Sequence, residues 1–319
     1  MDACDLVLAL ARATCRLPRL VSRGLALALG GGAARLWRGE RRRLLDTLDR
    51  VYHRAGRPPP RPLPEIVDHL FVHFALVCEE VLRLPQVTAA ELAARFHFTG
   101  VEHFEAALAR GRGVILVVPH LGNWELLGAA IAHHGWPLHS FYLAQKERDI
   151  GAALDLLRRH SRIVLHDRDR GAREALRALK QGEVLGMIAD QDGGNQAVYT
   201  EFCGHFVSVP AGPANWSLRT GAAVMPLFAL RRGCSPHYDC RFLPPLPEPR
   251  ATDPAGRVVE RTLQLLRGME GAILDHPEQY LWFYDRFKPR HHGWIARLKQ
   301  AGVPMRPGGA VYGVLPEAT

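Results

Sequence analysis

The chain has 319 residues, of which 47% are hydrophobic and 23% are charged, a balance that excludes a wholly disordered protein. This length suffices for one large domain, or for one domain with an appendage. Nearly all of the formal net charge of +9 lies in residues 1–62, which hold 13 arginines and only five acidic residues. Because apolar residues separate these arginines, we expect an anionic membrane surface, and no nucleic acid, as the partner of this end.

Residues 1–62 are predicted to be a membrane-associated helical segment. Arginines at positions 12, 16, 19 and 23 interrupt its apolar run, and this pattern does not fit a cleaved signal peptide. The uncharged stretch at residues 24–34 is shorter than the roughly 20 apolar residues that a spanning helix needs. We therefore interpret residues 6–37 as an interfacial or re-entrant anchor, with a spanning helix as the alternative.

The rest of the chain alternates between strand and helix patterns. A proline-rich linker at residues 57–64 (RPPPRPLP) precedes a predicted helix at residues 65–84. Strands are then predicted at residues 114–118, 138–143, 184–188 and 223–230, and helices at residues 123–134, 150–160, 172–181, 211–220 and 258–274. This order predicts an α/β domain over residues 63–307, with a largely parallel central sheet flanked by helices. Residues 308–319 are predicted to be a flexible tail.

A histidine and a glutamate follow the first buried strand. In the string GVILVVPHLGNWELLG (residues 113–128), the strand ends before Pro119 and His120 comes next, at the edge where open α/β sheets bind ligands. Glu125 falls in the first turns of the following helix. We expect it to fold back towards the imidazole, fixing the tautomer and leaving the other ring nitrogen free to accept a proton. Such a base suits acyl transfer to a neutral hydroxyl, while a structural hydrogen bond at a helix start is the plain alternative.

Other polar residues at this edge are candidate substrate contacts. Asn123 can cap the helix, touch the substrate, or do both. The strand at residues 184–188 runs into an acidic turn, whose members can line an acceptor pocket, order the site, or simply face solvent: Asp190, Gln191 and Asp192. Two carboxylates so close together could instead bind Mg²⁺ in a phosphohydrolase.

Several cationic side chains could hold the phosphates of a substrate. The candidates that we select are Arg158, Arg159 and Arg286. The sequence does not decide which of the neighbouring arginines near position 158 does so. The six cysteines show no Cys-x-x-Cys pair and no zinc spacing, so we expect reduced thiols.

Four stretches of the chain resemble the bacterial lysophospholipid acyltransferase superfamily, in particular the late acyltransferases that add lauroyl or myristoyl chains to lipid A. The first is residues 111–128, in which His120 and Glu125 match the family's His-x4-Asp/Glu hallmark. The others are residues 175–192, which end in Asp-Gln-Asp, residues 202–226, and residues 277–288 (PEQYLWFYDRFK). Together they span about residue 15 to residue 290.

The resemblance implies an O-acyltransferase that moves a fatty acyl chain from an acyl carrier protein or coenzyme A thioester to a hydroxyl of a membrane lipid, with lipid A biosynthesis as the setting. It also implies no metal, no cofactor, and a location at the cytoplasmic face of the bacterial inner membrane. A lysophospholipid, a glycolipid or an aminolipid is the alternative acceptor. A metal-dependent phosphohydrolase and an inert lipid-binding scaffold are the alternative functions.

Overall fold

The fold is built around one large, mostly parallel sheet. The structure is a computed structural model that describes residues 2–142, 150–167, 170–194 and 196–287, together with residues 293, 296, 297, 300, 302 and 311–314. The strands of the large sheet are β1 (Phe96–Thr99), β2 (Val114–Val118), β3 (Leu138–Tyr142), β4 (Val164–Asp167), β5 (Val184–Ile188), β8 (Ala223–Arg231) and β9 (Tyr238–Phe242). Their order within the described residues is β1-β9-β8-β2-β5-β3-β4, and β8 and β9 are the antiparallel neighbours.

Strand β2 occupies the middle of this sheet, as expected for a short and wholly apolar strand. All of its residues are buried, and it pairs in parallel with β5 on one side and with β8 on the other. Alternate side chains point to opposite faces, so Ile115 and Val117 join one core while Val114 and Leu116 join another. The carboxyl end of β2 therefore opens at the middle of the sheet edge.

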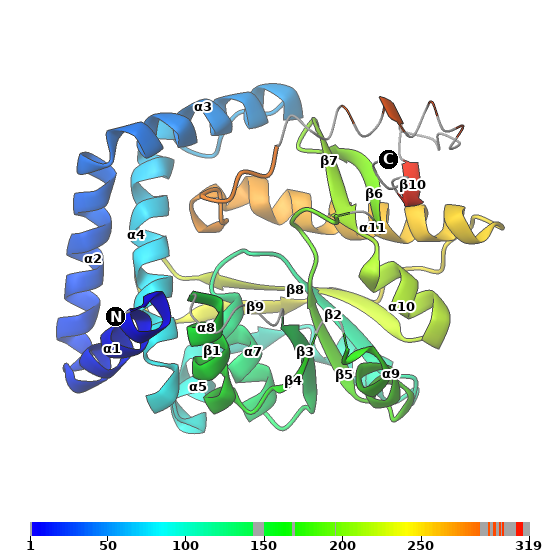
Figure 1. Cartoon of the computed structure of the whole chain (residues 1–319), viewed down its shortest axis with the longest axis horizontal. Coiled ribbons are helices and arrows are strands. Elements are labelled where there is room, and N and C mark those ends of the chain that lie inside the picture. Colours follow the sequence, from blue (N-terminus) through cyan, green and yellow to red (C-terminus); the bar gives the residue numbers. More distant parts are fainter. Residues whose placement is uncertain are drawn as a thin grey trace.

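Helices cover both faces of the sheet. They are α1 (Ala3–Arg16), α2 (Arg19–Leu36), α3 (Arg38–Ala55), α4 (Leu63–Leu82), α5 (Ala89–Arg95), α6 (Val101–Leu108), α7 (Trp124–His133), α8 (Ile150–Arg158), α9 (Ala172–Lys180), α10 (Gly212–Thr220) and α11 (Pro254–Asp275). One core contains Leu70 of α4 and Met269 of α11, and the other contains Phe104 of α6 and Leu127 of α7. Figure 1 shows α11 and α7 on opposite sides of the sheet.

A second sheet lies beside α11 (Figure 1). Its three strands are antiparallel, in the order β10 (Val311–Val314), β6 (Gln196–Phe202) and β7 (His205–Pro210). Strand β10 falls within residues 308–319, the segment for which the sequence predicts a flexible tail. Four residues of that segment therefore form an edge strand, since they find a partner in β6.

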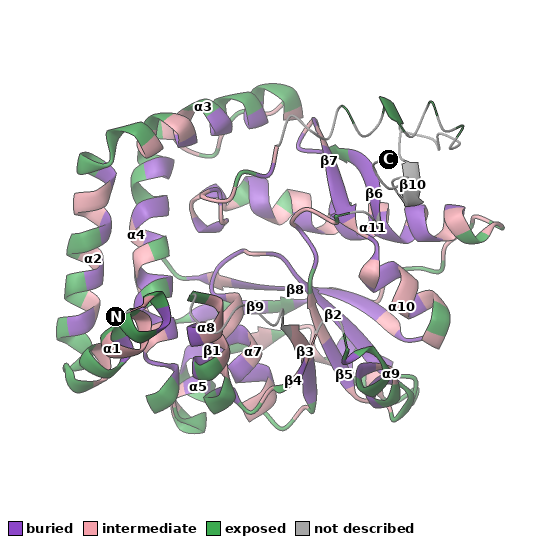
Figure 2. Cartoon of the chain, viewed as in Figure 1, coloured by how far each residue is buried: buried purple, intermediate pink, exposed green. Residues whose placement is uncertain are grey.

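The N-terminal helices form an arm in which α2 runs alongside α4 (Figure 1). The buried face of α2 consists of small residues spaced four apart: Ser22, Ala26, Gly30 and Ala34. A Cβ atom on Gly30 would lie 2.7 Å from the Cα of Val72, so glycine permits this close approach. The opposite face carries exposed leucines, and Figure 2 shows this outer side as solvent-exposed. Among the described residues, no helix is both long and apolar enough to cross a bilayer.

The predicted elements of the central domain are confirmed. Each helix and strand predicted between residues 65 and 274 is present, with ends that differ by at most a few residues. The sequence did not predict the following elements of this region: β1, β4, β6, β7, β9, α5 and α6. The α/β class with a mostly parallel central sheet flanked by helices is thus confirmed. The linker at residues 57–64 also separates α3 from α4.

Candidate active site

The site is built on the tight loop that joins β2 to α7. Gly122 has a φ of +70°, and a Cβ atom there would lie 1.7 Å from the carbonyl oxygen of Ala229 in β8. The backbone N–H of Gly122 donates to the carbonyl of Gln279 at 3.0 Å, and Nε2 of His73 in α4 donates to the Gly122 carbonyl at 3.1 Å. The loop is therefore fixed from three directions, and so is the position of His120 within it.

His120 is paired with Asp190, which lies two residues after the end of β5. Nδ1 of His120 lies 2.7 Å from Oδ1 of Asp190, and the backbone N–H of His120 donates to Oδ2 at 3.0 Å. The register of the parallel strands explains the pairing. Val118 lies opposite Ile188, and His120 and Asp190 each follow two residues later in the chain. Burial raises the pKa of Asp190, but the charge and hydrogen bonds of His120 outweigh it and lower the pKa. An ionised Asp190 therefore accepts the Nδ1 proton, which leaves Nε2 as the proton acceptor in a neutral imidazole.

Glu125 does not hold the imidazole as the sequence analysis expected. Its carboxylate accepts hydrogen bonds from Arg158, with Nε to Oε2 at 2.7 Å, and from the indole of Trp124 at 3.1 Å. Burial raises the pKa of Glu125, but Arg158 outweighs it, and the charge of His120 also contributes to a lowered pKa. The expectation was wrong about the partner because Glu125 lies in the first turn of α7, where it meets the last residue of α8.

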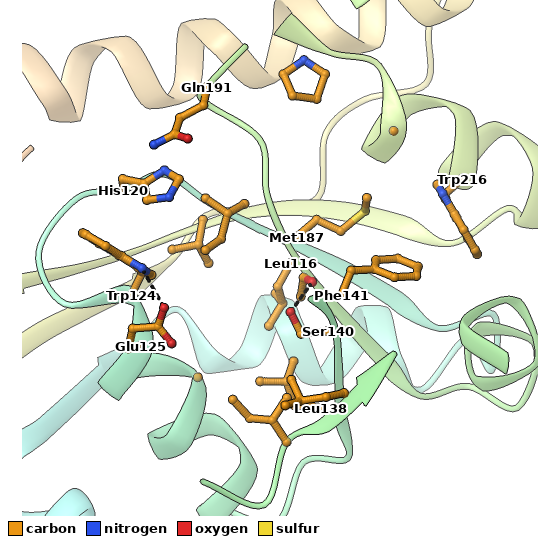
Figure 3. Close-up of a pocket in the computed structure, with 18 of the residues that line it drawn as sticks. Leu116, His120, Trp124, Glu125, Leu138, Ser140, Phe141, Met187, Gln191 and Trp216 are labelled. Carbon is orange, nitrogen blue, oxygen red and sulfur yellow. Dashed lines mark hydrogen bonds between the residues drawn. The ribbon is translucent and has the colours of Figure 1, made fainter. Parts of the chain in front are cut away.

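A cavity of about 1080 Å³ opens beside His120. Among its lining residues, Figure 3 shows His120 and Gln191 close to one another, with Leu138 and Trp216 lying away from them in two different directions. The wall of the cavity includes a set of apolar residues that we call the apolar limb: Leu116, Leu127, Gly128, Ile131, Leu138 and Ile163. A Cβ atom on Gly128 would lie 2.9 Å from Cδ1 of Ile163, so this glycine keeps the limb open.

A buried glutamate supports the loop from the side of α4. Glu80 is 3% exposed, and its carboxylate accepts bonds from Arg231 at 2.7 and 2.8 Å, and from Arg95 and Tyr238. It also accepts a bond from Nδ2 of Asn123 at 2.8 Å. Burial raises the pKa of Glu80, yet the charge of Arg231 and the other donors lower it to about 2. Helix α7, which carries Glu125, thus starts at Asn123, and the ionised carboxylate of Glu80 holds Asn123 in place.

Comparison with known proteins shows the family to which the chain belongs. The family described as bacterial lipid A biosynthesis acyltransferase matches residues 4–289. The chain belongs to this family. Among curated relatives of the acyltransferase, a lipid A biosynthesis acyltransferase of Haemophilus influenzae is 24% identical over 232 residues, which is 72% of this chain and 70% of that protein. The phosphatidylinositol mannoside acyltransferase of Mycolicibacterium smegmatis is 25% identical over 66% of this chain and 71% of that protein.

Among solved structures, the 1-acyl-sn-glycerophosphate acyltransferase PlsC of Thermotoga maritima aligns with a TM-score of 0.35 and 12% sequence identity. The alignment covers 80% of this chain and 99% of that chain. At this level of similarity the alignment carries no argument about the site. Family membership makes the protein an enzyme that transfers acyl groups, and such an enzyme requires an acyl donor and a lipid acceptor.

The structure of this acyltransferase divides the predicted substrate contacts into two groups. Arg158, Gln191 and Asp192 line the cavity, together with His120 and Glu125. Four other predicted contacts do not line it, and one of them is Asp190, whose carboxylate pairs with His120. Asn123 is fully buried, and its Oδ1 caps α7 by accepting from the N–H of Leu126 at 3.0 Å. Arg159 is exposed and Arg286 is buried; neither lines the cavity, and their contact with a substrate phosphate stays a prediction.

The two acids that could have bound Mg²⁺ have other partners in the acyltransferase. Asp190 binds His120, while Oδ1 of Asp192 accepts from the hydroxyl of Ser208 at 2.5 Å and from the N–H of Gly194 at 3.1 Å. Within the described ranges, no group of three or more histidine, cysteine, aspartate or glutamate side chains is placed to hold a metal ion.

Sequence analysis missed the residues that support the site from α4, β8 and β9. Glu80 was one of them, although the helix pattern contained a signal. Ile66, Leu70 and Val77 form the apolar stripe of α4, and Glu80 continues that stripe at the next helical position. A carboxylate on a buried helical face requires cationic partners, so its position predicts buried arginines elsewhere in the chain.

Proposed function

We propose that this acyltransferase moves a fatty acyl chain from an acyl carrier protein or coenzyme A thioester to a hydroxyl of a lipid acceptor in lipid A biosynthesis. One observation carries the proposal: His120 has Nδ1 on a buried carboxylate, and its ring lies at the end of a cavity with an apolar limb. The family match supports the setting in lipid A biosynthesis.

In the proposed reaction, His120 acts as a general base. Nε2 takes the proton of the acceptor hydroxyl while the hydroxyl oxygen forms a bond with the thioester carbonyl carbon. The carbon–sulfur bond then breaks, and the thiolate leaves with the proton that Nε2 returns. Asp190 stabilises the intervening imidazolium, a role that the sequence analysis assigned to Glu125. A positioned base of this kind contributes roughly 10²–10⁴-fold to the rate.

The Glu125–Arg158 pair has a different proposed role. Arg158 is bound by Glu125 and also by Asp155 at 2.8 Å, so its guanidinium is held at the cavity wall while part of it stays accessible. A fixed cation beside the base suits a phosphate of the donor or the acceptor. Glu125 thereby orients the cation and adds to the negative potential near His120.

The apolar limb is the proposed place for the acyl chain. Its lining comes from β2, β3 and α7, and its polar groups are few. A hydrocarbon chain that enters from His120 would leave water and become buried between these elements, which favours binding in proportion to the area covered. The lysophospholipid, glycolipid and aminolipid acceptors stay as alternatives, and a mycobacterial relative is named for a phosphatidylinositol mannoside substrate.

We further propose that the N-terminal arm lies on an anionic membrane, at the cytoplasmic face of the bacterial inner membrane. Leu25, Leu29 and Leu36 lie four and seven residues apart, on one face of α2, and they are 50, 70 and 83% exposed. Arginines flank this face along α1, α2 and α3. Apolar side chains with flanking cations favour a helix that lies in the interface of an anionic bilayer.

The enzymatic proposal is tested with membranes that contain the wild type, His120→Ala, or His103→Ala. The last variant removes an exposed histidine of α6 as a matched control. Labelled acyl carrier protein and coenzyme A donors are each offered with a lipid A precursor, a lysophospholipid, a glycolipid and an aminolipid. We expect transfer to the lipid A precursor by the wild type and the control, and none by His120→Ala. Undiminished transfer by folded His120→Ala would contradict the proposed base.

The membrane proposal is tested by flotation with vesicles of phosphatidylethanolamine, with or without phosphatidylglycerol. The variant Leu25→Ser/Leu29→Ser should float less than the wild type, because it removes apolar area from the proposed contact. The control Leu156→Ser/Val164→Ser changes two exposed apolar residues of α8 and β4 and should float as the wild type does. Equal flotation of all three proteins would refute docking through α2.

A further inference from the structure

The guanidinium of Arg286 is buried without a hydrogen-bond partner. The residue is 2% exposed, and none of its three nitrogens has a partner within the described chain. The guanidinium lies 5.8 Å from the centre of the Phe202 ring. A buried cation that makes no hydrogen bond opposes folding, so its presence calls for an explanation other than stability.

The segment that carries Arg286 runs directly behind the catalytic loop. The N–H of Leu281 donates to the carbonyl of His120 at 3.0 Å, and Leu121 forms an antiparallel bridge with Tyr280. Burial raises the pKa of the Tyr280 hydroxyl well above its usual value, and the charge of Asp190 acts in the same direction. These backbone contacts hold the segment that carries Arg286 against the loop that carries His120, whose ring is paired with Asp190.

The charge of Arg286 acts on Asp190. Burial lowers the pKa of Arg286, and the groups that oppose this are Tyr280, Asp190, Tyr284 and Asp192. Cys203 lies near Arg286 as well, and Glu270 faces Cys203. On the cavity side, Glu125 and Arg158 complete the charged surroundings of the His120–Asp190 pair. Guanidinium groups stay protonated in proteins, so Arg286 contributes a permanent positive charge.

We propose that Arg286 is a positioning residue that acts through Asp190: its buried charge keeps Asp190 ionised and offsets the pull of that carboxylate on the imidazole proton. This inference rests on the proposed function of His120 as a base. Without Arg286, the unopposed carboxylate would favour the imidazolium, and an imidazolium cannot accept the proton of a hydroxyl.

The experiment compares Arg286→Met, Arg286→Lys and Arg261→Met. Arg261 is also buried, at 1% exposure, but it binds Leu246 and Glu248 away from the site, which makes it a matched control. The kcat/KM of acyl transfer is measured from pH 5 to pH 9, and stability is measured by urea unfolding. We expect the acidic limb of the Arg286→Met profile to move to higher pH by about one unit, since charge partners shift titrations by one to three units.

The same variants separate an electrostatic role from a structural one. Arg286→Met should keep or raise the urea midpoint, because it removes an unpartnered charge, and Arg286→Lys should return the acidic limb towards its original position. Arg261→Met should lower the urea midpoint and leave the acidic limb in place. A loss of activity by one factor at every pH, or a Lys variant that behaves like Met, would overturn the proposal.

A second readout keeps the test independent of the substrate. The His120 imidazole is titrated by NMR in protein with ¹³C-labelled histidine, and the His120→Ala spectrum assigns its signal. Arg286→Met should shift this titration to higher pH even if the chosen acceptor is not a substrate. An unshifted titration refutes the role of Arg286, whereas a shifted titration in a protein without acyl transfer refutes the proposed function alone.

Discussion

Two buried charged clusters meet at the loop between β2 and α7, and they are built differently. In the cluster around Glu80, the carboxylate is bound by Arg231, Arg95, Tyr238 and Asn123. In the cluster around Asp190, the carboxylate binds His120, and Arg286 has no hydrogen-bond partner among the residues that the structure describes. The first arrangement satisfies a buried carboxylate on all sides, while the second leaves charge to act at a distance.

The two clusters suit different roles: the Glu80 cluster stabilises the fold, and the Asp190 cluster supports the proposed reaction. A fully bonded ion pair resists change, because removal of any partner leaves an uncompensated charge in the interior. A general base must instead alternate between neutral and charged forms, so its surroundings cannot be saturated for one form alone. The loop is therefore rigid on the side of α4 and electrostatically responsive on the side of β5.

The largest expected effect comes from Asp190→Asn. The amide keeps the size of the side chain but removes the charge that stabilises the imidazolium, so kcat/KM for acyl transfer should fall by roughly 10²–10⁴-fold. Steady-state kinetics measure this, with Asp239→Asn as the control, because Asp239 pairs with Arg232 at the surface. Activity within twofold of the wild type would show that the His120–Asp190 bond is structural.

Glu80→Ala should produce the largest loss of stability. It leaves Arg231 and Arg95 buried without their carboxylate, so the free energy of unfolding should fall by about 3–5 kcal/mol. Urea unfolding measures this, with Glu65→Ala as the matched control, since Glu65 is 46% exposed and its partner Arg61 is 38% exposed. If Glu80→Ala were as stable as the control, the Glu80 cluster would not be a source of stability for the fold.

His73→Gln should change how stability depends on pH. Burial, with the charge of Arg231, lowers the pKa of His73 to about 3 from an ordinary value of 6.5. Because the pKa is lower in the folded state than in the unfolded state, the contribution of His73 to stability is complete above pH 6.5 and is lost as the pH falls towards 3. The free energy of unfolding of the wild type should therefore fall by about 2 kcal/mol between pH 6.5 and pH 5. Glutamine can still donate to Gly122 but does not titrate.

The measurement is urea unfolding at pH 6.5 and at pH 5. On acidification, the free energy of unfolding of His73→Gln should fall by about 2 kcal/mol less than that of the wild type. The carboxylate of Glu80 does not interfere in this window, because its contribution is lost only as the pH falls from about 4.5 towards 2. An identical pH dependence in the variant and the wild type would contradict a neutral, buried His73.

Asn123 joins the two clusters and should give the smallest effect. Asn123→Ala removes the cap of α7 and one donor to Glu80, so the free energy of unfolding should fall by about 1–2 kcal/mol. Asn123→Ser keeps a capping oxygen but not the bond to Glu80, and it should lie between Ala and the wild type. Acyl transfer by both variants should exceed that of Asp190→Asn, and the reverse order would place Asn123 in the substrate site.

Much of the fold and the place of the site followed from local sequence patterns. Wholly apolar β2 and β5 were predicted because buried parallel strands need no polar face. His120, Asp190, Gln191 and Asp192 were candidates because they follow these strands, and parallel strands end at one edge. The predictions of Arg158 at the site and of Asn123 as a helix cap also agree with the structure.

The pairing within the site did not follow from the sequence, for physical reasons. Glu125 was the expected partner of His120 because it is near in sequence, whereas Asp190 is near in space once β5 pairs with β2 in register. The contact depends on which strands are neighbours in the sheet, and local sequence patterns do not reveal the order of the strands. Arg286 was predicted to bind phosphate, whereas the structure buries it outside the wall of the cavity, a position that local sequence patterns do not reveal.

Gly122 has a consequence for protein engineering. Because the space beside its Cα is filled by the carbonyl of Ala229, and its φ is positive, any other residue would have to displace β8 itself. A mutagenesis library that aims to alter acceptor or chain-length preference should leave position 122 unvaried and place its diversity along the apolar limb, where Gly128 meets only the flexible end of Ile163. In a search for related sequences, glycine two positions after the histidine is a filter that chance His-x4-Glu strings would seldom pass.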